Sequence, residues 1–561
     1  MRTDADPESP PRLLKVCGAD VELGNFFLGG RGSGSSGAEA ARALLREIAG
    51  VPARGGWSRP VQPEDWRSSV YGGRSSCEGL RSHESNSLAG DAQDWGRKFL
   101  PDNGGCVYID LDHLEVCIPE VTSAWDFVAA WHAMLRLARH AQHAVNQNAP
   151  AGRQVQVLAN NSDGQGNSYG SHLNFLITRR AWDNIFNRRM HHLLYLAAFQ
   201  VSSLVFTGQG KVGSENQRPH APYQLSQRAD FFEVLTGPQT TYQRPIVNSR
   251  DETLCGSRRG LGEDDPARLH AIFFDSTLAH VATLLRVGVM QIVLAMIEAE
   301  RVNPSLMLED PVEAVTQVSH DPTLKKARPR MASGQRLTAI EIQMRFLEEA
   351  RSMEASGAFH GTVPRAGEIL ALWEETLTRL ERRDFDWLAP RLDWVMKLSL
   401  IERALDLRRG LDWDSPEIKH LDQAYSSLGD DGLYFAQERS GSACHMVGED
   451  AVARFEEHPP PDTRAWTRAM LLRGLHPSCF DAVDWDSMTL RLPGNGYWPL
   501  YRTLSMPDPL GMTQAECQEA FRQWSTASDL VNAIQGFGDT RSFGAGMVPG
   551  IAGVRPGYLL N

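Results

Sequence analysis

The chain has 561 residues, a formal net charge of −12 and 42% hydrophobic residues, enough to bury a large core. Non-specific binding to nucleic acid needs a basic surface, so the acidic balance argues against a nucleic-acid partner. Eight scattered cysteines without a Cys-x-x-Cys pair, no apolar stretch long enough for a membrane span and no secretory signal layout predict a cytoplasmic protein without a membrane partner.

Two of the predicted strands carry acidic residues. Residues 14–23 alternate between apolar and polar side chains, which places Asp20 and Glu22 on the same face of a strand. A second strand is expected over residues 106–111 and carries Asp110 near its end. Two strands of this kind could present their carboxylates to one point.

The rest of the chain mixes helices and strands irregularly. We expect strands over residues 154–158 and 173–178, and helices over residues 38–50, 123–146, 183–205, 278–302, from 337 onward, 367–382 and 391–408. This order favours the α+β class over alternating βαβ units.

Composition divides the chain into a large domain, a smaller domain and a tail. We expect a catalytic domain over residues 12–410, interrupted at 25–100 by an insertion whose Gly- and Ser-rich core predicts a mobile loop. Shorter elements follow in a C-terminal domain over 411–530. The Gly-rich stretch 531–561 is typical of a disordered tail.

The carboxylates are the first candidates for chemistry. Besides Asp20, Glu22 and Asp110, the second strand is followed by Glu115 and Glu120. Mg²⁺ is bound through carboxylate oxygens together with substrate phosphates, so acidic pairs on two strands could hold it. For one Asp-x-Glu pair by itself, a solvated strand edge is the commoner explanation.

A polar, glycine-rich segment over Asn160–Asn174 offers backbone N–H groups to an anion and ends with His172 and Asn174 on one strand face. Basic residues that could bind phosphate follow it: Lys211, Arg228, Arg244, Arg250 and Arg268. Each of them alone is more often a surface ion pair. From the residues alone, the sequence predicts an acidic metal site beside a basic anion site, as in an enzyme that uses Mg²⁺ and a nucleotide.

In this order, the segments resemble the family of the Pup ligase and the Pup deamidase/depupylase, which are relatives of glutamine synthetase. The most specific matches are Asn160–Asn174, Tyr223–Asp230, Arg244–Glu252, Arg268–His270 with Asp275, Leu392–Trp394 and Pro460–Ala465. The resemblance implies a large glutamine-synthetase-like domain, in which helices pack on a curved antiparallel sheet, and a smaller C-terminal domain.

Three features are similar to the depupylase branch. Glu22 and Asp110 lie 88 positions apart, which resembles that branch's long connection between the acidic strands. The segments Ser168–His172 and Gly432–Tyr434 are more similar to the depupylases than to the ligases. Asp462, within the motif Pro461–Arg464, matches the depupylase variant of that motif.

The resemblance also implies roles for individual residues. Asp110 matches the catalytic aspartate. The implied metal ligands are Asp20, Glu22, Glu115, Glu120, His172 and His270. The implied nucleotide-binding residues are Arg228, Arg250, Asn174 and Lys211.

Several positions depart from the family pattern. Asp20 replaces a glutamate of the metal-binding pair and has one methylene less. The remaining departures are Leu114, Leu173, Phe274 and His280. They stand beside the implied site and leave Asp110 intact, which favours an active but divergent relative and leaves its substrate open.

The resemblance therefore implies an amidohydrolase that uses ATP and Mg²⁺ and acts on the C-terminal Gln amide or isopeptide bond of a Pup-like disordered protein or of pupylated proteins, within the proteasome system. Two alternatives stay open. The same residues could serve an ATP-dependent carboxylate–amine ligase, or the chain could bind a Pup-like tail or a nucleotide without catalysis.

Overall fold

A computed structural model describes residues 13–28, 36–53, 95–150, 152–252, 254–255, 262–493 and 499–539. Its centre is an eight-stranded sheet in the order β12–β7–β1–β5–β4–β3–β2, and β6 pairs with the far end of β1. All these pairings are antiparallel. The strands are β1 (Cys17–Leu28), β2 (Val51–Pro52), β3 (Trp95–Phe99), β4 (Cys106–Asp110), β5 (His113–Val121), β6 (Gln154–Leu158), β7 (Ser171–Thr178) and β12 (Pro266–Ala271).

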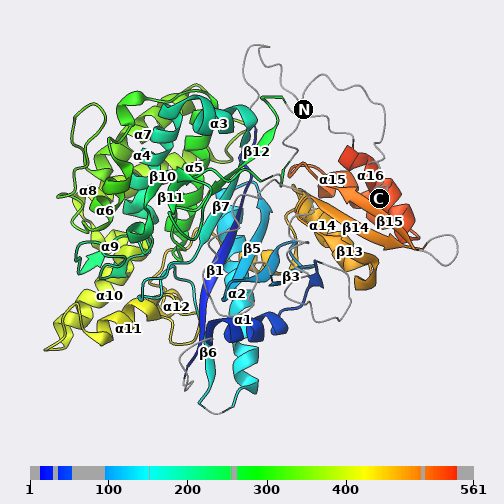
Figure 1. Ribbon diagram of the computed structural model, residues 1–561, viewed down its shortest axis with the longest axis horizontal. Coiled ribbons are helices and arrows are strands. Elements are labelled where there is room, and N and C mark those ends of the chain that lie inside the picture. Colours follow the sequence, from blue (N-terminus) through cyan, green and yellow to red (C-terminus); the bar gives the residue numbers. More distant parts are fainter. Residues whose placement is uncertain are drawn as a thin grey trace, which may run out of the picture.

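Strand β1 runs through the middle of this sheet (Figure 1). Its odd-numbered residues from Cys17 to Leu23 are at most 3% exposed and point into the core. Since successive side chains of a strand alternate between faces, Asp20 and Glu22 lie together on the opposite face. The alternation in the sequence therefore produces a sheet with an apolar face and an acidic face.

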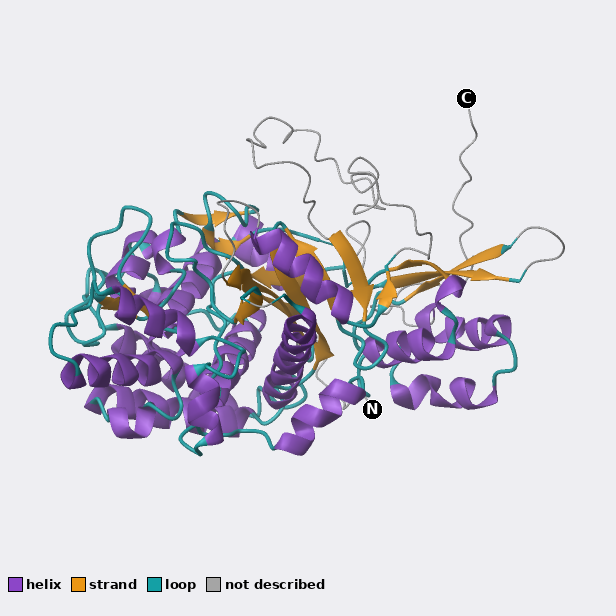
Figure 2. Cartoon of the chain, turned by 90° about the horizontal axis from the view of Figure 1, so that it is seen from below, coloured by secondary structure: helices purple, strands orange, loops and turns teal. Residues whose placement is uncertain are grey.

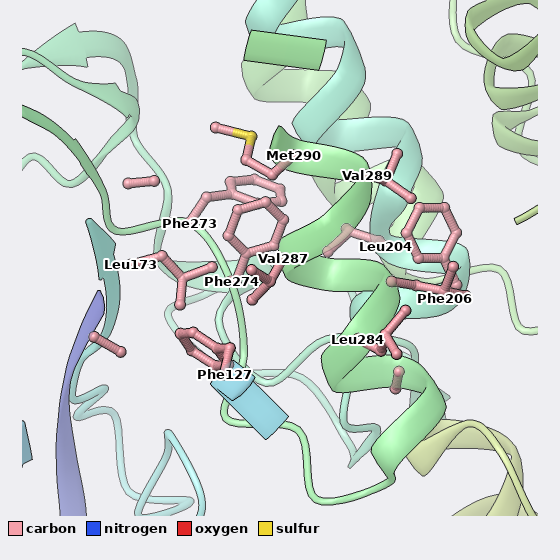
Figure 3. Packing of buried hydrophobic residues seen from close by; sticks show 14 of the residues in the cluster. Phe127, Leu173, Leu204, Phe206, Phe273, Phe274, Leu284, Val287, Val289 and Met290 are labelled. Carbon is pink, nitrogen blue, oxygen red and sulfur yellow. The ribbon is translucent and has the colours of Figure 1, made fainter. Parts of the chain in front are cut away.

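Helices cover the apolar face. Helix α2 (Ala124–Asn148) packs against β5 and β6, and α5 (His280–Glu298) packs against β7 and α2. Figure 3 shows this layer, where Leu173 of β7 and Phe127 of α2 lie beside side chains of α5. Helix α5 is long and apolar enough to cross a membrane by length and composition, but its apolar window is entirely buried inside the protein.

The other helices extend this layer and the C-terminal part. They are α1 (Ser36–Glu47), α3 (Arg179–Asp183), α4 (Met190–Thr207), α6 (Pro311–Ser319), α7 (Ala339–Ala355), α8 (Ala366–Arg382), α9 (Phe385–Leu388), α10 (Asp393–Leu407), α11 (Pro416–Tyr425), α12 (Leu433–Arg439), α13 (Glu449–Glu457), α14 (Arg464–Gly474), α15 (Gln514–Gln523) and α16 (Ala527–Asp539). Short strands form two further pairs, β8 (Lys211–Val212) with β9 (Tyr223–Gln224) and β10 (Val234–Gly237) with β11 (Pro245–Asn248).

A smaller unit lies at the β3 side of the main sheet (Figures 1 and 2). It contains α14–α16 and an antiparallel sheet of β13 (Phe480–Val483), β14 (Ser487–Leu492) and β15 (Leu500–Ser505). Its hydrophobic cluster also takes in Phe99, Cys106 and Tyr108 of the main sheet. The expected class, α+β with an antiparallel sheet, packed helices and a smaller C-terminal domain, is confirmed.

Some expected boundaries differ from the structure. Strand β1 continues to Leu28, and β3 begins at Trp95, so both ends of the expected insertion at 25–100 belong to the sheet. Residues 54–94 of that insertion lie outside the described residues. Helix α16 extends to Asp539 because its apolar residues Leu530, Val531 and Ile534 are buried in the smaller unit, so residues 531–539 of the expected tail are helical. Residues 540–561 lie outside the described residues.

Two other differences concern helix continuity and packing. The single helix expected over 183–205 is broken at Arg189, which leaves helical geometry with φ −135° and ψ 84°, and α4 then begins at Met190. Although a domain boundary was expected at residue 410, the large hydrophobic cluster includes side chains as far as Phe455. The boundary itself stays a prediction.

Candidate active site

Three carboxylates from three strands meet on the acidic face of the sheet. Glu22 of β1 is directly opposite Glu115 of β5, and Glu115 is opposite Tyr108 of β4, two residues before Asp110. One oxygen atom from each of Glu22, Asp110 and Glu115 lies within 4.8 Å of the others. Such a spacing of oxygen ligands suits a hard divalent cation.

A second group of possible ligands lies next to the first on the same face. Asp20 is opposite His172 of β7, and His270 of β12 is one strand further along the sheet. The Nδ1 atom of His172 is 3.1 Å from Asp20 Oδ2, and the Nε2 atom of His270 is 3.9 Å from the same oxygen. Asp20, His172 and His270 therefore offer one carboxylate and two imidazoles to one position.

Burial and neighbouring charge change the protonation of the first group. Burial raises the pKa of Glu22 to about 8, and the negative charge of Asp110 adds to this, although Arg228 and Arg244 oppose it. A carboxyl group in this state is neutral at pH 7 until a cation replaces its proton.

The second group has the opposite balance. Burial acts to raise the pKa of Asp20, but the neighbouring His172 and His270 outweigh it and hold that pKa well below the usual range. Burial lowers the pKa of His270 to about 4, with Arg268 adding to the effect, and burial also lowers the pKa of His172. Both imidazoles are thus neutral, which is the form that binds a metal ion.

A glycine separates the two groups. A Cβ atom at Gly170 would lie 2.5 Å from His172 Nε2 and 2.7 Å from Glu22 Oε1. The preceding residue, Tyr169, stacks on His113 with ring centroids 4.3 Å apart, and His113 Nδ1 lies 3.5 Å from Glu22 Oε2. The loop that enters β7 therefore fits closely over the carboxylates only because position 170 has no side chain.

Arg228 fixes the position of this loop through hydrogen bonds. It is fully buried and donates to the carbonyl oxygens of Tyr169 and Ile272. Burial lowers its pKa to about 9, so it remains a cation at pH 7 and its charge acts on Glu22. Its N–H groups donate to backbone carbonyl oxygens. In the structure, this residue, which was predicted to bind nucleotide, therefore positions the loop that enters β7.

The other predicted polar residues of the site form a chain along β7 and β12. Arg268 Nη1 donates to Asn174 Oδ1 over 2.7 Å, and Asn174 Nδ2 donates to Asp20 Oδ1 over 2.5 Å. Arg250 is 37% exposed, its guanidinium lies 3.6 Å from Glu252, and its charge lowers the pKa of His172. Asn174 therefore contacts the second group directly, and the charge of Arg250 acts on it.

Glu120 and Lys211 are not brought to this face. Both oxygens of Glu120 pair with Arg464 and Arg468 of α14, and these arginines lower its pKa to about 2 although burial opposes them. Lys211 is buried and pairs with Glu215 at 2.8 Å and with Asp230 at 3.3 Å. In the described structure, each charge is balanced by partners outside the two ligand groups.

Three of the four divergent positions point away from the site. Leu114 and Leu173 are 0% exposed and belong to the core beneath the sheet, since each lies between two residues that face the site. Phe274 is also fully buried and packs edge-to-face on Phe273, as Figure 3 shows. These replacements alter the packing under the sheet and leave its acidic face unchanged.

The residues present fit a metal ion. Among the described residues, neither ring nitrogen of buried His270 has a hydrogen-bond partner. Paired glutamates next to an Asp–His–His group also form a donor set of the kind that divalent cations bind.

Residues that the sequence reasoning missed are Gly170, His113 and the hairpin strand β5 itself. The alternation from His113 to Val116 was the available signal for β5.

Comparison with known proteins identifies relatives in the family that the sequence motifs resemble. The model of the family described as "Pup-ligase protein" matches residues 15–489. The "Depupylase" of Acidothermus cellulolyticus is 36% identical over 442 residues, 77% of this chain and 82% of that protein. The "Pup deamidase/depupylase" of Mycolicibacterium smegmatis is 35% identical over 437 residues, 77% and 82% of the two chains. The "Pup–protein ligase" of Acidimicrobium ferrooxidans is 34% identical over 424 residues, 74% and 88% of the two chains.

Solved structures share the fold. The Pup ligase PafA in complex with ADP superposes with a TM-score of 0.65 at 25% identity and covers 85% of this chain and 97% of that one. A ligase PafA in complex with the ubiquitin-like protein Pup superposes with a TM-score of 0.70 at 24% identity, covering 96% and 99% of the two chains.

Proposed function

This chain belongs to the Pup-ligase family, and we propose that it is an ATP- and Mg²⁺-dependent amidohydrolase for the C-terminal Gln amide or isopeptide bond of a Pup-like protein. The observation that carries the proposal is the position of Asp110, within 4.8 Å of Glu22 and Glu115 on the sheet. A reactive carboxylate next to carboxylates that can bind a metal ion is an arrangement that can hydrolyse an amide.

The choice of hydrolysis over ligation has separate support. Glu22 and Asp110 are 88 positions apart, as the depupylase resemblance implies. The depupylase and deamidase relatives also match with 36% and 35% identity. The ligase relative, at 34% identity, keeps ligation as the second candidate function.

In the proposed reaction, Asp110 attacks the amide carbon or takes a proton from the water that attacks it. The C–N bond then breaks, and ammonia or the lysine amine leaves once its nitrogen has taken up a proton, from water in the first case and from Asp110 in the second. In the first case water then cleaves the anhydride between Asp110 and the substrate, which releases the product carboxylate and regenerates Asp110. Bound Mg²⁺ supplies positive charge that stabilises oxygen anions and orients phosphate groups. Glu22, Glu115, Asp20, His172 and His270 would hold the cations.

The cofactor assignment rests on the charges around the second group. The ADP named with the ligase structure supports a nucleotide site in this chain. Arg250 is partly exposed, its charge acts on His172, and it would contact the phosphates, while Asn174 would keep Asp20 in place. We propose a cytoplasmic protein whose partners are a Pup-like protein or pupylated proteins, with a link to the proteasome system.

The test combines the chain with Mg²⁺, ATP and Pup ending in Gln or in Glu, and measures ammonia and ADP separately. We expect ammonia only from the Gln form, with far less than one ADP per turnover. Asp110→Asn, an isosteric change, should remove ammonia release by at least about a thousandfold and retain nucleotide binding.

Two other outcomes would contradict the proposal. ADP formed in proportion to a product that joins the Glu form to a lysine would establish ligation. Absence of turnover in every condition, with Pup affinity unchanged by Asp110→Asn, would leave a non-catalytic binder.

A further inference from the structure

A second cluster of histidines lies away from the sheet, where α2, α5 and α12 meet. It contains His132 of α2, His280 at the first position of α5 and Glu438 of α12. One ligand atom from each lies within 4.8 Å of the others. Of the four divergent positions named above, three belong to the core under the sheet. His280 is the fourth, and it belongs to this cluster.

The His132 ring is hydrogen-bonded through one nitrogen, which leaves the other as a possible ligand. Its Nε2 atom is 3.0 Å from the carbonyl oxygen of Leu278, to which a neutral imidazole donates its N–H. The other ring nitrogen, Nδ1, is then left with a lone pair. Metal-bound histidines characteristically donate their second nitrogen to a backbone carbonyl in this way.

His280 faces His132 and Glu438. Its ring centroid is 4.2 Å from that of His132, and its Nε2 atom is 4.0 Å from Glu438 Oε1. Its Nδ1 atom accepts a long hydrogen bond, 3.3 Å, from the backbone N–H of Met446. If Nε2 binds a metal ion, the ring proton moves to Nδ1, and this contact to the loop after α12 has to open.

That loop carries a third histidine. The ring centroid of His445 is 4.8 Å from that of His280, and His445 is exposed while His132 and His280 are almost fully buried. A small shift of the loop would bring His445 to a fourth ligand position. Solvent reaches the cluster from this side, since Glu438 is 25% exposed.

The surrounding charges allow a cation. Arg136, a positive group whose charge acts on His132 and His280, pairs with Glu449 at 2.5 Å and lies 3.8 Å from Glu456. Burial lowers the pKa of His132 to about 4 and also lowers the pKa of His280, so both rings are neutral at pH 7. Neutral imidazoles and a carboxylate then remain as ligands.

We propose that His132, His280 and Glu438, completed by His445, form a zinc site distinct from the active site. Three imidazole nitrogens and one carboxylate oxygen are a donor set that Zn²⁺ takes in tetrahedral geometry, whereas Mg²⁺ prefers oxygen ligands. The site connects α12 and the loop after it to α2 and to the first residue of α5. It is therefore a structural site.

The test uses the full chain carrying Asp20→Asn, which weakens the competing ligand group of the active site, in the presence of excess Mg²⁺. Co²⁺ alone is titrated in, and the visible absorption that marks tetrahedral cobalt is measured. We expect one equivalent with this band, displaced by Zn²⁺. Zn²⁺ should also raise the melting temperature.

The decisive variant adds Glu438→Gln and His445→Ala, both at least partly exposed, so that folding without metal is retained. We expect it to lose the tetrahedral band and to bind Zn²⁺ at least about tenfold more weakly. Asp450→Asn is the matched control, because it removes an exposed carboxylate from the first turn of α13, and it should keep the band. An unchanged band in the double variant, or only the weak spectrum of octahedral cobalt in the parent, would overturn the proposal.

Discussion

Glu22 of β1 lies directly opposite Glu115 of β5 in the antiparallel register, although the two residues are 93 positions apart in the sequence. Like charges in opposed positions of neighbouring strands destabilise a sheet. Here both residues are less than 10% exposed. Burial and the charge of Asp110 raise the pKa of Glu22 to about 8, and this raised pKa links metal binding to pH.

Replacing Glu22 tests this link. The folded protein holds the Glu22 proton up to a pKa of about 8, against 4.5 for an ordinary glutamate. The stability contributed by this group in the metal-free protein is complete below about pH 4.5 and is lost as the pH rises through about 8. Mg²⁺ displaces the proton, so Mg²⁺ affinity should rise with pH towards 8.

We expect Glu22→Gln to weaken Mg²⁺ binding by at least about tenfold and to flatten its dependence on pH. The metal-free variant should melt at least as high as the parent at pH 8, because a neutral amide replaces a costly charge. Calorimetric Mg²⁺ titrations from pH 6 to 9 and melting curves measure both effects, and a parallel pH slope in the variant would refute the explanation.

The close fit at Gly170 gives a second prediction. A methyl group there would lie 2.5 Å from His172 Nε2, so Gly170→Ala should displace the ligands and reduce kcat/KM by about a hundredfold or more. Gly18→Ala on β1 is the matched control, since its Cβ would meet only Ile118 O at 3.9 Å. The control should stay within about twofold of the parent in the ammonia assay, and equal activity of both variants would contradict the model of the site.

Replacing Glu120 distinguishes a structural role of this residue from a role in metal binding. Its two arginine partners belong to α14, so Glu120→Gln should destabilise the protein by about 3–5 kcal/mol by leaving buried positive charge. The pKa of about 2 means that this stabilisation is present above about pH 4.5 and is lost as the pH falls through 2.

Urea unfolding of Glu120→Gln measures the loss, and Asp102→Asn is the control. Asp102 is 68% exposed and 3.8 Å from Arg473, so its removal should cost less than about 0.5 kcal/mol. Unchanged stability together with weaker Mg²⁺ binding in Glu120→Gln would instead assign Glu120 to the metal site.

Replacing Lys211 distinguishes a structural role of this residue from a role in nucleotide binding. Because its ammonium group is 4% exposed and pairs with Glu215 and Asp230, Lys211→Met should cost about 3–5 kcal/mol of stability. The KM for ATP should stay within about twofold. Arg330→Met, which breaks an exposed pair with Glu309, should be nearly neutral. A large rise in KM without a lower melting temperature would identify Lys211 as a nucleotide ligand.

Local patterns predicted much of this protein. The alternation around Asp20 and Glu22 predicted β1 and its acidic face, and helical periodicity predicted α2, α5, α7, α8 and α10 within a few residues. The motifs predicted the family, which the matches confirm. These features depend on neighbours in the sequence or on residues that keep their type and order, so a one-dimensional reading can detect them.

The partner of each buried charge could not be found in this way. Glu120 and Glu115 are both acidic residues of one short segment, yet Glu115 faces Glu22 and Glu120 faces two arginines some 340 positions later. Their roles differ because strand register and helix packing decide which distant group neutralises each carboxylate in a medium of low dielectric. The sequence by itself determined which residues can carry charge and ligate metal, and only the tertiary structure decided which of them share a site.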